Sequence, residues 1–333
     1  PTRFHGIGKF DPVTGKSLGG SVPTFSGSFG QTLIDLAARN SRVCAITAAM
    51  SAGTGLTEFM RRYPERTFDV GIAEEHAVSM AGGLAKQGMI PVVALYSTFL
   101  QRSYDQLLQD VAMLHLHVVL AIDRAGLVGD DGPTHHGVFD VGFLRQMPGM
   151  LILAPASLAE QRDMLRWAVE CYDGPVAVRY PRGGQGAYTD SAWGEKETVF
   201  QGNLCCHKPG GDVILVTYGS LVNNVLESAD LLEKRGIHAG VLRLTNLSTF
   251  PTASILEAGR GPIVVVEEAC TGSGIRESLA WAVHGLDPER TVLGIDLGSD
   301  FVPHGAREQL YKLCGLDAVS IAEYVEGVTR NED

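Results

Sequence analysis

The chain has 333 residues, of which 45% are hydrophobic and 20% are charged, and its formal net charge is -11. This composition is typical of a folded chain of two ordinary domains. The acidic balance disfavours nucleic acid or an anionic membrane as a partner, because either requires a concentrated basic face. No apolar run reaches the length of a membrane span, and the opening residues lead us to expect no signal peptide.

The cysteines favour a reducing compartment. There are six, and only Cys205 and Cys206 are adjacent. Without CxxC pairs or a dense framework they are predicted to be reduced thiols, which favours a cytoplasmic location. His207 is the only histidine near the pair, so we predict no zinc site there.

The first half of the chain alternates between short β-branched runs and helical patterns. Such alternation predicts an α/β fold with mostly parallel sheets flanked by helices. A capping box, Ser157 followed by Glu160, is expected to begin the last of these helices. We expect strands at 43–49, 91–96, 117–123, 150–155 and 176–181, and helices at 30–39, 74–86, 101–114 and 157–171.

A second α/β block follows a stretch rich in glycine, serine, threonine and charge. Its strands are expected at 213–219, 238–244, 262–268 and 291–296, with helices near 221–235 and 274–284. The predicted organisation is an extended arm at 1–20, a first domain at 21–183, a linker at 184–211 and a second domain at 212–333.

The stretch GIAEEHAVSM places two adjacent glutamates at the start of a helix. At about 100° per residue, Glu74 lies about 60° from the apolar stripe centred on Ala77, whereas Glu75 lies on the opposite side. The preceding residues 70–73 suggest a buried strand end. We therefore expect Glu75 in water and Glu74 in a dry pocket, where a carboxyl group can serve as a protonated donor.

Several segments of the sequence are similar to segments of known enzymes. DVGIAEEHAVSMAGGLA resembles the glutamate-bearing motif of thiamine-diphosphate enzymes in the transketolase superfamily. YSTFLQRSYDQ, DRAGLVGDDGPTHHGVFD and AVRYPRG make the chain similar to the 1-deoxy-D-xylulose-5-phosphate synthase family. The similarity extends over nearly the whole chain. It implies a pyrimidine-binding domain followed by a transketolase C-terminal-like domain.

In that family another, N-terminal domain binds the cofactor diphosphate through Mg²⁺. It would carry Gly-Asp-Gly followed about one helix later by asparagine. The near match at 129–132 is followed by no asparagine before Asn203. We therefore expect this chain to lack the diphosphate-binding domain, to carry no metal ligand, and to need that domain or a companion chain for activity.

The resemblance also implies roles at the cofactor. Glu74 would give a hydrogen bond to the pyrimidine of thiamine diphosphate, Phe99 would stack on that ring, and Arg102 would contact the pyrimidine region or a substrate oxygen. The protein would supply orientation and the acid, and the cofactor the electron sink. Without the resemblance, Phe99 would be an ordinary core residue and Arg102 a solvated one.

The substrates implied are pyruvate and D-glyceraldehyde 3-phosphate, which condense to 1-deoxy-D-xylulose 5-phosphate and CO₂. Tyr96, Arg124 and Arg182 would hold the aldehyde phosphate, since guanidinium groups present paired donors to phosphate oxygens. Arginines at strand ends are otherwise often solvated caps. Asp131 and His135 would lie in a loop that reaches the active site. The Asp-Gly-Pro sequence of this loop is also a strong turn signal, so a plain turn without a catalytic role would explain it equally.

Five further residues receive no catalytic role. His136 and Glu75 stand where family members commonly carry glutamine, and His76 matches the family without a known task. Glu267 and Glu268 are expected to be structural or to lie at a contact between the subunits of a homodimer, the assembly that the resemblance implies.

Two alternatives remain open. The chain could be a separate C-terminal subunit of a two-chain transketolase or 2-oxo acid decarboxylase, with a companion carrying the diphosphate site. It could also be a non-catalytic module that has kept the fold. The DRAG and YSTFLQR segments favour the synthase family over both.

Overall fold

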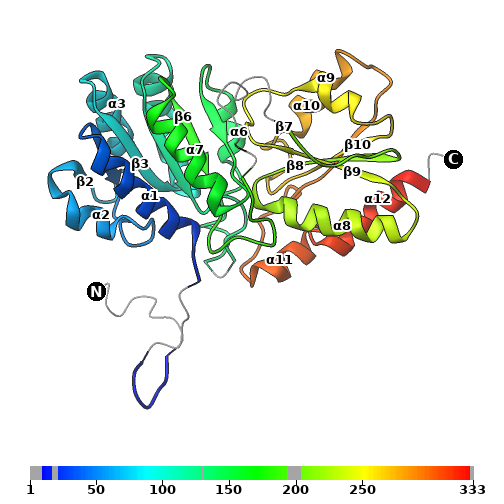
Figure 1. Cartoon of the computed structure of the whole chain (residues 1–333), viewed down its shortest axis with the longest axis horizontal. Coiled ribbons are helices and arrows are strands. Elements are labelled where there is room, and N and C mark those ends of the chain that lie inside the picture. The colour runs from blue at the N-terminus through cyan, green and yellow to red at the C-terminus, as the bar shows by residue number, and fades with distance from the viewer. Residues whose placement is uncertain (1–9, 17–21, 130, 192, 194–203, 331–333) are drawn as a thin grey trace.

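A computed structural model describes residues 10–16, 22–129, 131–191, 193 and 204–330. These residues form two β-sheets with helices on both faces, one sheet in each half of the chain (Figure 1). The predicted α/β class with mostly parallel sheets is confirmed. Within those ranges no helix is long and apolar enough to cross a membrane.

The first sheet has six parallel strands in the order β2-β1-β3-β4-β6-β5. Their side chains are almost all buried, which is typical of a parallel sheet covered on both faces. The strands are β1 (Val43–Thr47), β2 (Thr67–Asp69), β3 (Ile90–Tyr96), β4 (Val119–Asp123), β5 (Leu151–Leu153) and β6 (Val176–Arg179).

Two layers of helices cover this sheet. On one face α1 (Phe25–Arg39), α2 (Thr57–Arg62) and α7 (Leu158–Glu170) contribute to one core cluster. On the other, α3 (Glu74–Lys86), α6 (Asp140–Arg145) and the segment 97–112 contribute to a second. The start of α1 was placed too late in the sequence, because Thr24 caps this helix by accepting a hydrogen bond from the amide of Gly27.

The segment after β3 is helical but not one regular helix. It begins directly at the strand end with α4 (Ser97–Leu100) and continues as a 3-10 turn (Gln101–Ser103), α5 (Tyr104–Gln106) and a π-helical turn (Leu107–Ala112). Changes of helical pitch of this kind re-aim side chains and are frequent at functional sites. Phe99 and Arg102 lie in its first two turns.

The second sheet has the order β11-β10-β8-β9-β7, and β7 alone runs antiparallel to its neighbour β9. Figure 1 shows α8, α11 and α12 on one side of it and α9 and α10 on the other. Its elements are β7 (Leu204–Lys208), β8 (Val213–Tyr218), α8 (Val222–Lys234), β9 (Ala239–Leu244), α9 (Thr252–Glu257), β10 (Ile263–Val266), α10 (Arg276–His284), β11 (Val292–Ile295), α11 (Arg307–Leu313) and α12 (Ala318–Arg330).

Strand β7 corrects part of the predicted linker. The weak periodicity of Leu204–Lys208 predicts a linker, but the segment pairs with β9 as an edge strand with an irregular register. An edge strand is only half covered, so a clear alternation of apolar residues is not required of it. Residues 194–203 of the predicted linker, and most of the predicted arm, lie outside the described residues.

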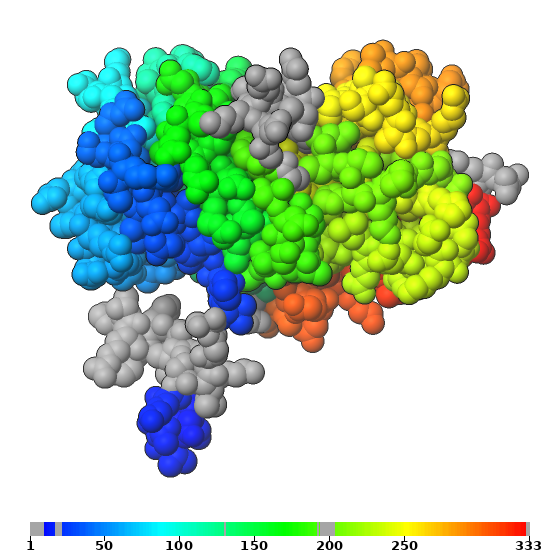
Figure 2. Space-filling model, viewed as in Figure 1, coloured from blue at the N-terminus to red at the C-terminus, as the bar shows by residue number. Residues whose placement is uncertain are grey.

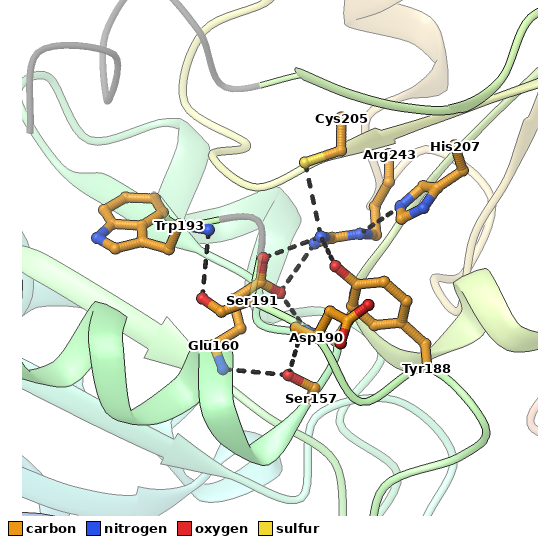
Figure 3. Close-up of polar contacts among 10 residues, drawn as sticks. Ser157, Glu160, Tyr188, Asp190, Ser191, Trp193, Cys205, His207 and Arg243 are labelled. Atoms are coloured by element: carbon orange, nitrogen blue, oxygen red, sulfur yellow. Dashed lines mark hydrogen bonds and ion pairs between the residues drawn. The ribbon is translucent and has the colours of Figure 1, made fainter. Parts of the chain in front are cut away.

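The two halves share a core and a buried polar contact. One core cluster runs from the first sheet through α6 to β8, β10 and α10, and Figure 2 shows the halves in contact along their facing sides. In Figure 3 the guanidinium of Arg243, on β9, faces the carboxylate of Glu160, on α7. Both side chains are fully buried, and their two hydrogen bonds measure 3.0 and 2.9 Å.

The predicted capping box at this helix is correct only in part. Ser157 Oγ accepts from the amide of Glu160, as expected for an N-cap. The carboxylate of Glu160, however, accepts from the amide of Ala156 and pairs with Arg243. His207 accepts a further bond from Arg243 Nε, because burial and the nearby guanidinium lower the pKa of this imidazole to about 4.

Candidate active site

Residues from three segments of the first half meet at the carboxyl edge of its sheet. Strands β3 and β4 end at Tyr96 and Asp123, and β6 ends at Arg179, just before Arg182. Because all six strands are parallel, the loops that follow these ends emerge at the same edge. This is where ligands bind in open α/β sheets.

Glu74 is the first residue of α3 and its side chain is 2% exposed. Its Oε1 accepts a hydrogen bond of 2.6 Å from Arg102 Nη1. Its Oε2 is also buried and has no hydrogen-bond partner among the described residues. A buried carboxylate oxygen without a partner is costly, so this oxygen marks a place for a ligand donor or acceptor.

The surroundings of Glu74 differ from expectation in two ways. The preceding residues do not form a buried strand end, since β2 stops at Asp69 and Ile72 is 79% exposed. The carboxylate also pairs with the guanidinium of Arg102, a partner that the apolar helical pattern behind the expected dry pocket does not indicate. Glu75 and His76 are both exposed, in line with the position predicted for Glu75 on the helix.

Phe99 lies at the centre of the predicted site residues. Its ring is 5.9 Å from that of Tyr96 and close to parallel with it. The ring of His135 meets it edge-on at 5.4 Å, and the guanidinium of Arg102 lies 4.8 Å from its centroid. Through Arg102, the phenylalanine is connected to Glu74.

Arg124 is held tightly beside Tyr96. Its guanidinium lies 3.7 Å from the centroid of the tyrosine ring, and its Nη1 donates to the carbonyl of Gly53 over 3.2 Å. Its backbone has a positive φ of 61°, which is costly for a residue with a side chain and is found most often at functional sites. Burial raises the pKa of the Tyr96 hydroxyl, which Arg124 partly offsets.

Asp123, which sequence reasoning did not single out, is fully buried at the end of β4. Its Oδ1 is 3.3 Å from Arg124 Nη1, and its Oδ2 accepts a bond of 2.6 Å from Ser26. Burial raises its pKa to about 6, against the lowering effect of Arg124. The sequence feature that could have identified Asp123 is an aspartate at the end of an apolar strand, followed directly by an arginine.

Arg182 and Asp131 form a more exposed pair, with Arg182 Nη1 3.3 Å from Asp131 Oδ2. The same Nη1 donates to the carbonyl of Val128 over 2.9 Å. The nitrogen Nδ1 of His135 shares a hydrogen bond of 2.9 Å with Thr134 Oγ1. The structure therefore brings the predicted phosphate-binding and loop residues to the same edge as Glu74 and Phe99.

A cavity of about 790 Å³ opens beside Phe99. Its wall includes two residues that the sequence did not indicate, Phe139, which is 40% exposed, and Phe301 of the second half, which is 81% exposed. Across the ranges that the structure covers, no group of three or more His, Cys, Asp or Glu side chains is placed to hold a metal ion.

The chain matches two families in succession. Residues 22–185 match the family described as "Transketolase, pyrimidine binding domain", and residues 202–321 match "Transketolase, C-terminal domain".

Two bacterial relatives, both named 1-deoxy-D-xylulose-5-phosphate synthase, are similar over almost the entire chain. The protein of Symbiobacterium thermophilum is 44% identical over 333 residues, which cover 98% of this chain and 50% of the relative. That of Geobacter sulfurreducens (synthase 1) is 45% identical over 335 residues, covering 98% and 52%. The chain thus spans about half the length of these relatives.

Solved structures with the same fold include a split-gene transketolase, described as an inactive beta4 tetramer. It is 26% identical with a TM-score of 0.79, and the match covers 92% of this chain and 98% of that one. A transketolase of Pichia stipitis in complex with sedoheptulose-7-phosphate has a TM-score of 0.75 at 16% identity, over 94% of this chain and 46% of that one, and shows the fold alone. The chain belongs to the transketolase family, with a pyrimidine-binding domain at residues 22–185 followed by a C-terminal domain at residues 202–321.

Proposed function

We propose that this chain supplies the pyrimidine-activating half of a 1-deoxy-D-xylulose-5-phosphate synthase. The reaction is the thiamine-diphosphate-dependent condensation of pyruvate with D-glyceraldehyde 3-phosphate, with release of CO₂. The similarity of about 44% to synthases over the whole chain supports this reaction rather than another of the superfamily.

The observation that carries the proposal is the buried Oε2 of Glu74, which has no hydrogen-bond partner among the described residues. A carboxyl group that presents one buried oxygen fits a ring nitrogen of an aminopyrimidine. Arg102 holds Oε1 and so fixes the orientation of the group. An unrelated helix-start glutamate would instead face water, as Glu75 does.

Three residues would then hold the pyrimidine of thiamine diphosphate. The bound cofactor supplies the electron sink that stabilises a carbanion. Glu74 holds a proton at Oε2 and directs it to the ring nitrogen, and Phe99 offers one face for stacking. Arg102 keeps the carboxyl group in place, and its guanidinium lies over the Phe99 ring, 4.8 Å from the ring centroid.

The phosphate of the aldehyde would lie between Tyr96, Arg124 and Arg182. Arg124 is preorganised by its strained backbone and by the tyrosine ring, so little side-chain entropy is lost when it binds an anion. Arg182 has a partly exposed side chain, so one of its faces is accessible. His135, packed against Phe99, and Asp131 would exchange protons with substrate oxygens.

The diphosphate and its Mg²⁺ would be bound by another domain. The chain spans about half the length of the synthases that it matches, which supports a partner domain in the same or another polypeptide. A homodimer and a cytoplasmic location remain predictions.

A second candidate is a separate subunit of a two-chain transketolase. It is favoured by the split-gene structure, because the match covers 98% of that chain. The substrates distinguish the two. A synthase requires pyruvate and releases CO₂, whereas a transketolase uses a ketose phosphate as donor and releases none.

The proposal is tested with the complete enzyme, assayed for CO₂ release from pyruvate in the presence of D-glyceraldehyde 3-phosphate. Glu74→Gln should lower kcat by about 10²–10⁴-fold while the circular dichroism spectrum is retained, since general acid catalysis contributes that much. Glu75→Gln is the matched control and should stay within about twofold, as expected for an exposed substitution.

Near-wild-type turnover of Glu74→Gln would refute the role of this glutamate. Calorimetry of the isolated chain with thiamine diphosphate and Mg²⁺ tests the need for a partner domain. We expect no tight binding by this chain alone, and tight metal-dependent binding would contradict that expectation.

A further inference from the structure

The loop that carries Asp131 and His135 is shaped by the C-terminal domain. We call residues 126–129 and 131–137 the glycine loop. Gly126, Gly129 and Gly132 all have a positive φ, of 79°, 87° and 76°. A Cβ on each would lie 2.7 Å from Glu268 Oε1, 3.1 Å from the carbonyl of Gly305 and 3.1 Å from His304 Cβ, respectively. These three glycines therefore lie close against the other domain.

Three hydrogen bonds reinforce this contact. Glu268, two residues after the end of β10, accepts from the amide of Leu127 over 3.1 Å. Arg307 Nη1, at the start of α11, donates to the carbonyl of Arg182 over 3.1 Å. The third joins the ring of His136 to the carbonyl of Pro303 at 3.1 Å.

His136 uses both ring nitrogens and is 3% exposed. A carbonyl can only accept, so Nε2 carries the hydrogen and donates it to Pro303. The amide of Val128 can only donate, so Nδ1 accepts it, over 3.2 Å. The partners thus fix one neutral tautomer, which bridges the C-terminal domain and the backbone of the glycine loop.

The residue that His136 holds, Val128, also contacts one of the proposed substrate-binding residues. The carbonyl of Val128, the residue whose amide His136 holds, accepts from Arg182 Nη1, and the same nitrogen lies 3.3 Å from Asp131. His135 precedes His136 in the chain, so the placement of one ring constrains the other. A shift of Val128 would therefore move the anchor of Arg182.

We propose that His136 is a positioning residue, through which the C-terminal domain sets the geometry of Arg182 and His135 for the phosphorylated aldehyde. The inference rests on the proposed function for the identity of that substrate. Under this proposal the C-terminal domain helps to position the residues that bind the aldehyde substrate, in addition to packing against the first domain.

Two variants separate positioning from stability. His136→Leu removes both hydrogen bonds and keeps an apolar side chain of similar reach. In the complete enzyme we expect KM for D-glyceraldehyde 3-phosphate to rise about tenfold, the size of a lost buried hydrogen bond, with KM for pyruvate unchanged. His136→Gln keeps one donor and one acceptor, and should restore most of the loss.

Ser248→Ala is the control for a general loosening of the domain junction. Ser248 also bridges two backbone groups of the pyrimidine-binding domain, accepting from Ile152 and donating to Met150, but it lies outside the glycine loop. It should leave both KM values unchanged. If His136→Leu does not fold, Glu268→Ala tests the same contact from the C-terminal domain and should raise the same KM.

Amide hydrogen exchange of this chain gives a readout that needs no activity. In His136→Leu the Val128 amide should exchange about tenfold faster, because its acceptor is lost, and in Ser248→Ala it should not. Unchanged exchange, or equal KM changes for both substrates, would overturn the proposal. If the wild-type complete enzyme releases no CO₂ from pyruvate, the proposed function fails, and the exchange rates still decide whether His136 holds the loop.

Discussion

Replacing Arg243 by methionine should strongly destabilise the junction between the domains. The guanidinium is fully buried, and it makes two hydrogen bonds to an equally buried Glu160 as well as one to His207. Removing one partner of such a pair leaves an uncompensated buried charge, at a cost of about 3–5 kcal/mol. With an unfolding entropy of about 2.1 cal/mol/K per residue, this corresponds to a fall in Tm of roughly 4–7 °C for a chain of 333 residues.

The measurement is urea unfolding followed by circular dichroism, together with the double variant Glu160→Met and Arg243→Met. The double variant should recover most of the lost free energy of unfolding, because an apolar pair of similar volume avoids desolvation of both charges. Arg61→Met, which breaks an exposed ion pair with Glu58, is the control and should cause no measurable change. A loss below about 1 kcal/mol in Arg243→Met would refute the reasoning, since it would fall within the range of an exposed pair.

Two further predictions concern the site. Arg182→Ala should raise KM for D-glyceraldehyde 3-phosphate at least about tenfold through loss of charge-assisted hydrogen bonds, and steady-state kinetics showing equal effects on pyruvate would contradict a phosphate role. The pKa of Asp123 is raised by burial from 3.8 to about 6, so its protonated form adds stability that is complete below about pH 4 and is lost as the pH rises through 6. The difference in free energy of unfolding between wild type and Asp123→Asn should therefore change by about 2 kcal/mol between pH 4 and 7, and a difference independent of pH in urea titrations would show that Asp123 does not titrate as described.

The parts of the fold that could be predicted depend on local pattern. Apolar runs such as Val43–Thr47 and Val119–Asp123 are buried on both faces of a parallel sheet, so hydrophobicity alone identifies them. The helical period likewise separated Glu74 from Glu75. Strand β7 was not predicted because it lies at the edge of its sheet. Its side chains are only partly buried, so the sequence does not need a clear apolar pattern there.

The parts of the site that escaped prediction depend on tertiary contact. Arg102 pairs with Glu74 across 28 positions of the chain, and no spacing rule connects them. Glu268 and Leu127 are 141 positions apart. His136 has no signature as a positioning residue, because its task is defined by a carbonyl of the other domain.

The packing of the glycine loop has a consequence for the order of folding. Gly126, Gly129 and Gly132 owe their close approach to Glu268 and to residues 304–305, which are made after the whole pyrimidine-binding domain during synthesis. The pyrimidine-binding domain could form its sheet and bury Glu74 early. Its glycine loop, however, would have no surface to pack against until the C-terminal domain docks. The glycine loop would therefore be the last part of the candidate site to form, so a chain shortened at its C-terminus is expected to retain the surroundings of Glu74 and lose the ordered loop.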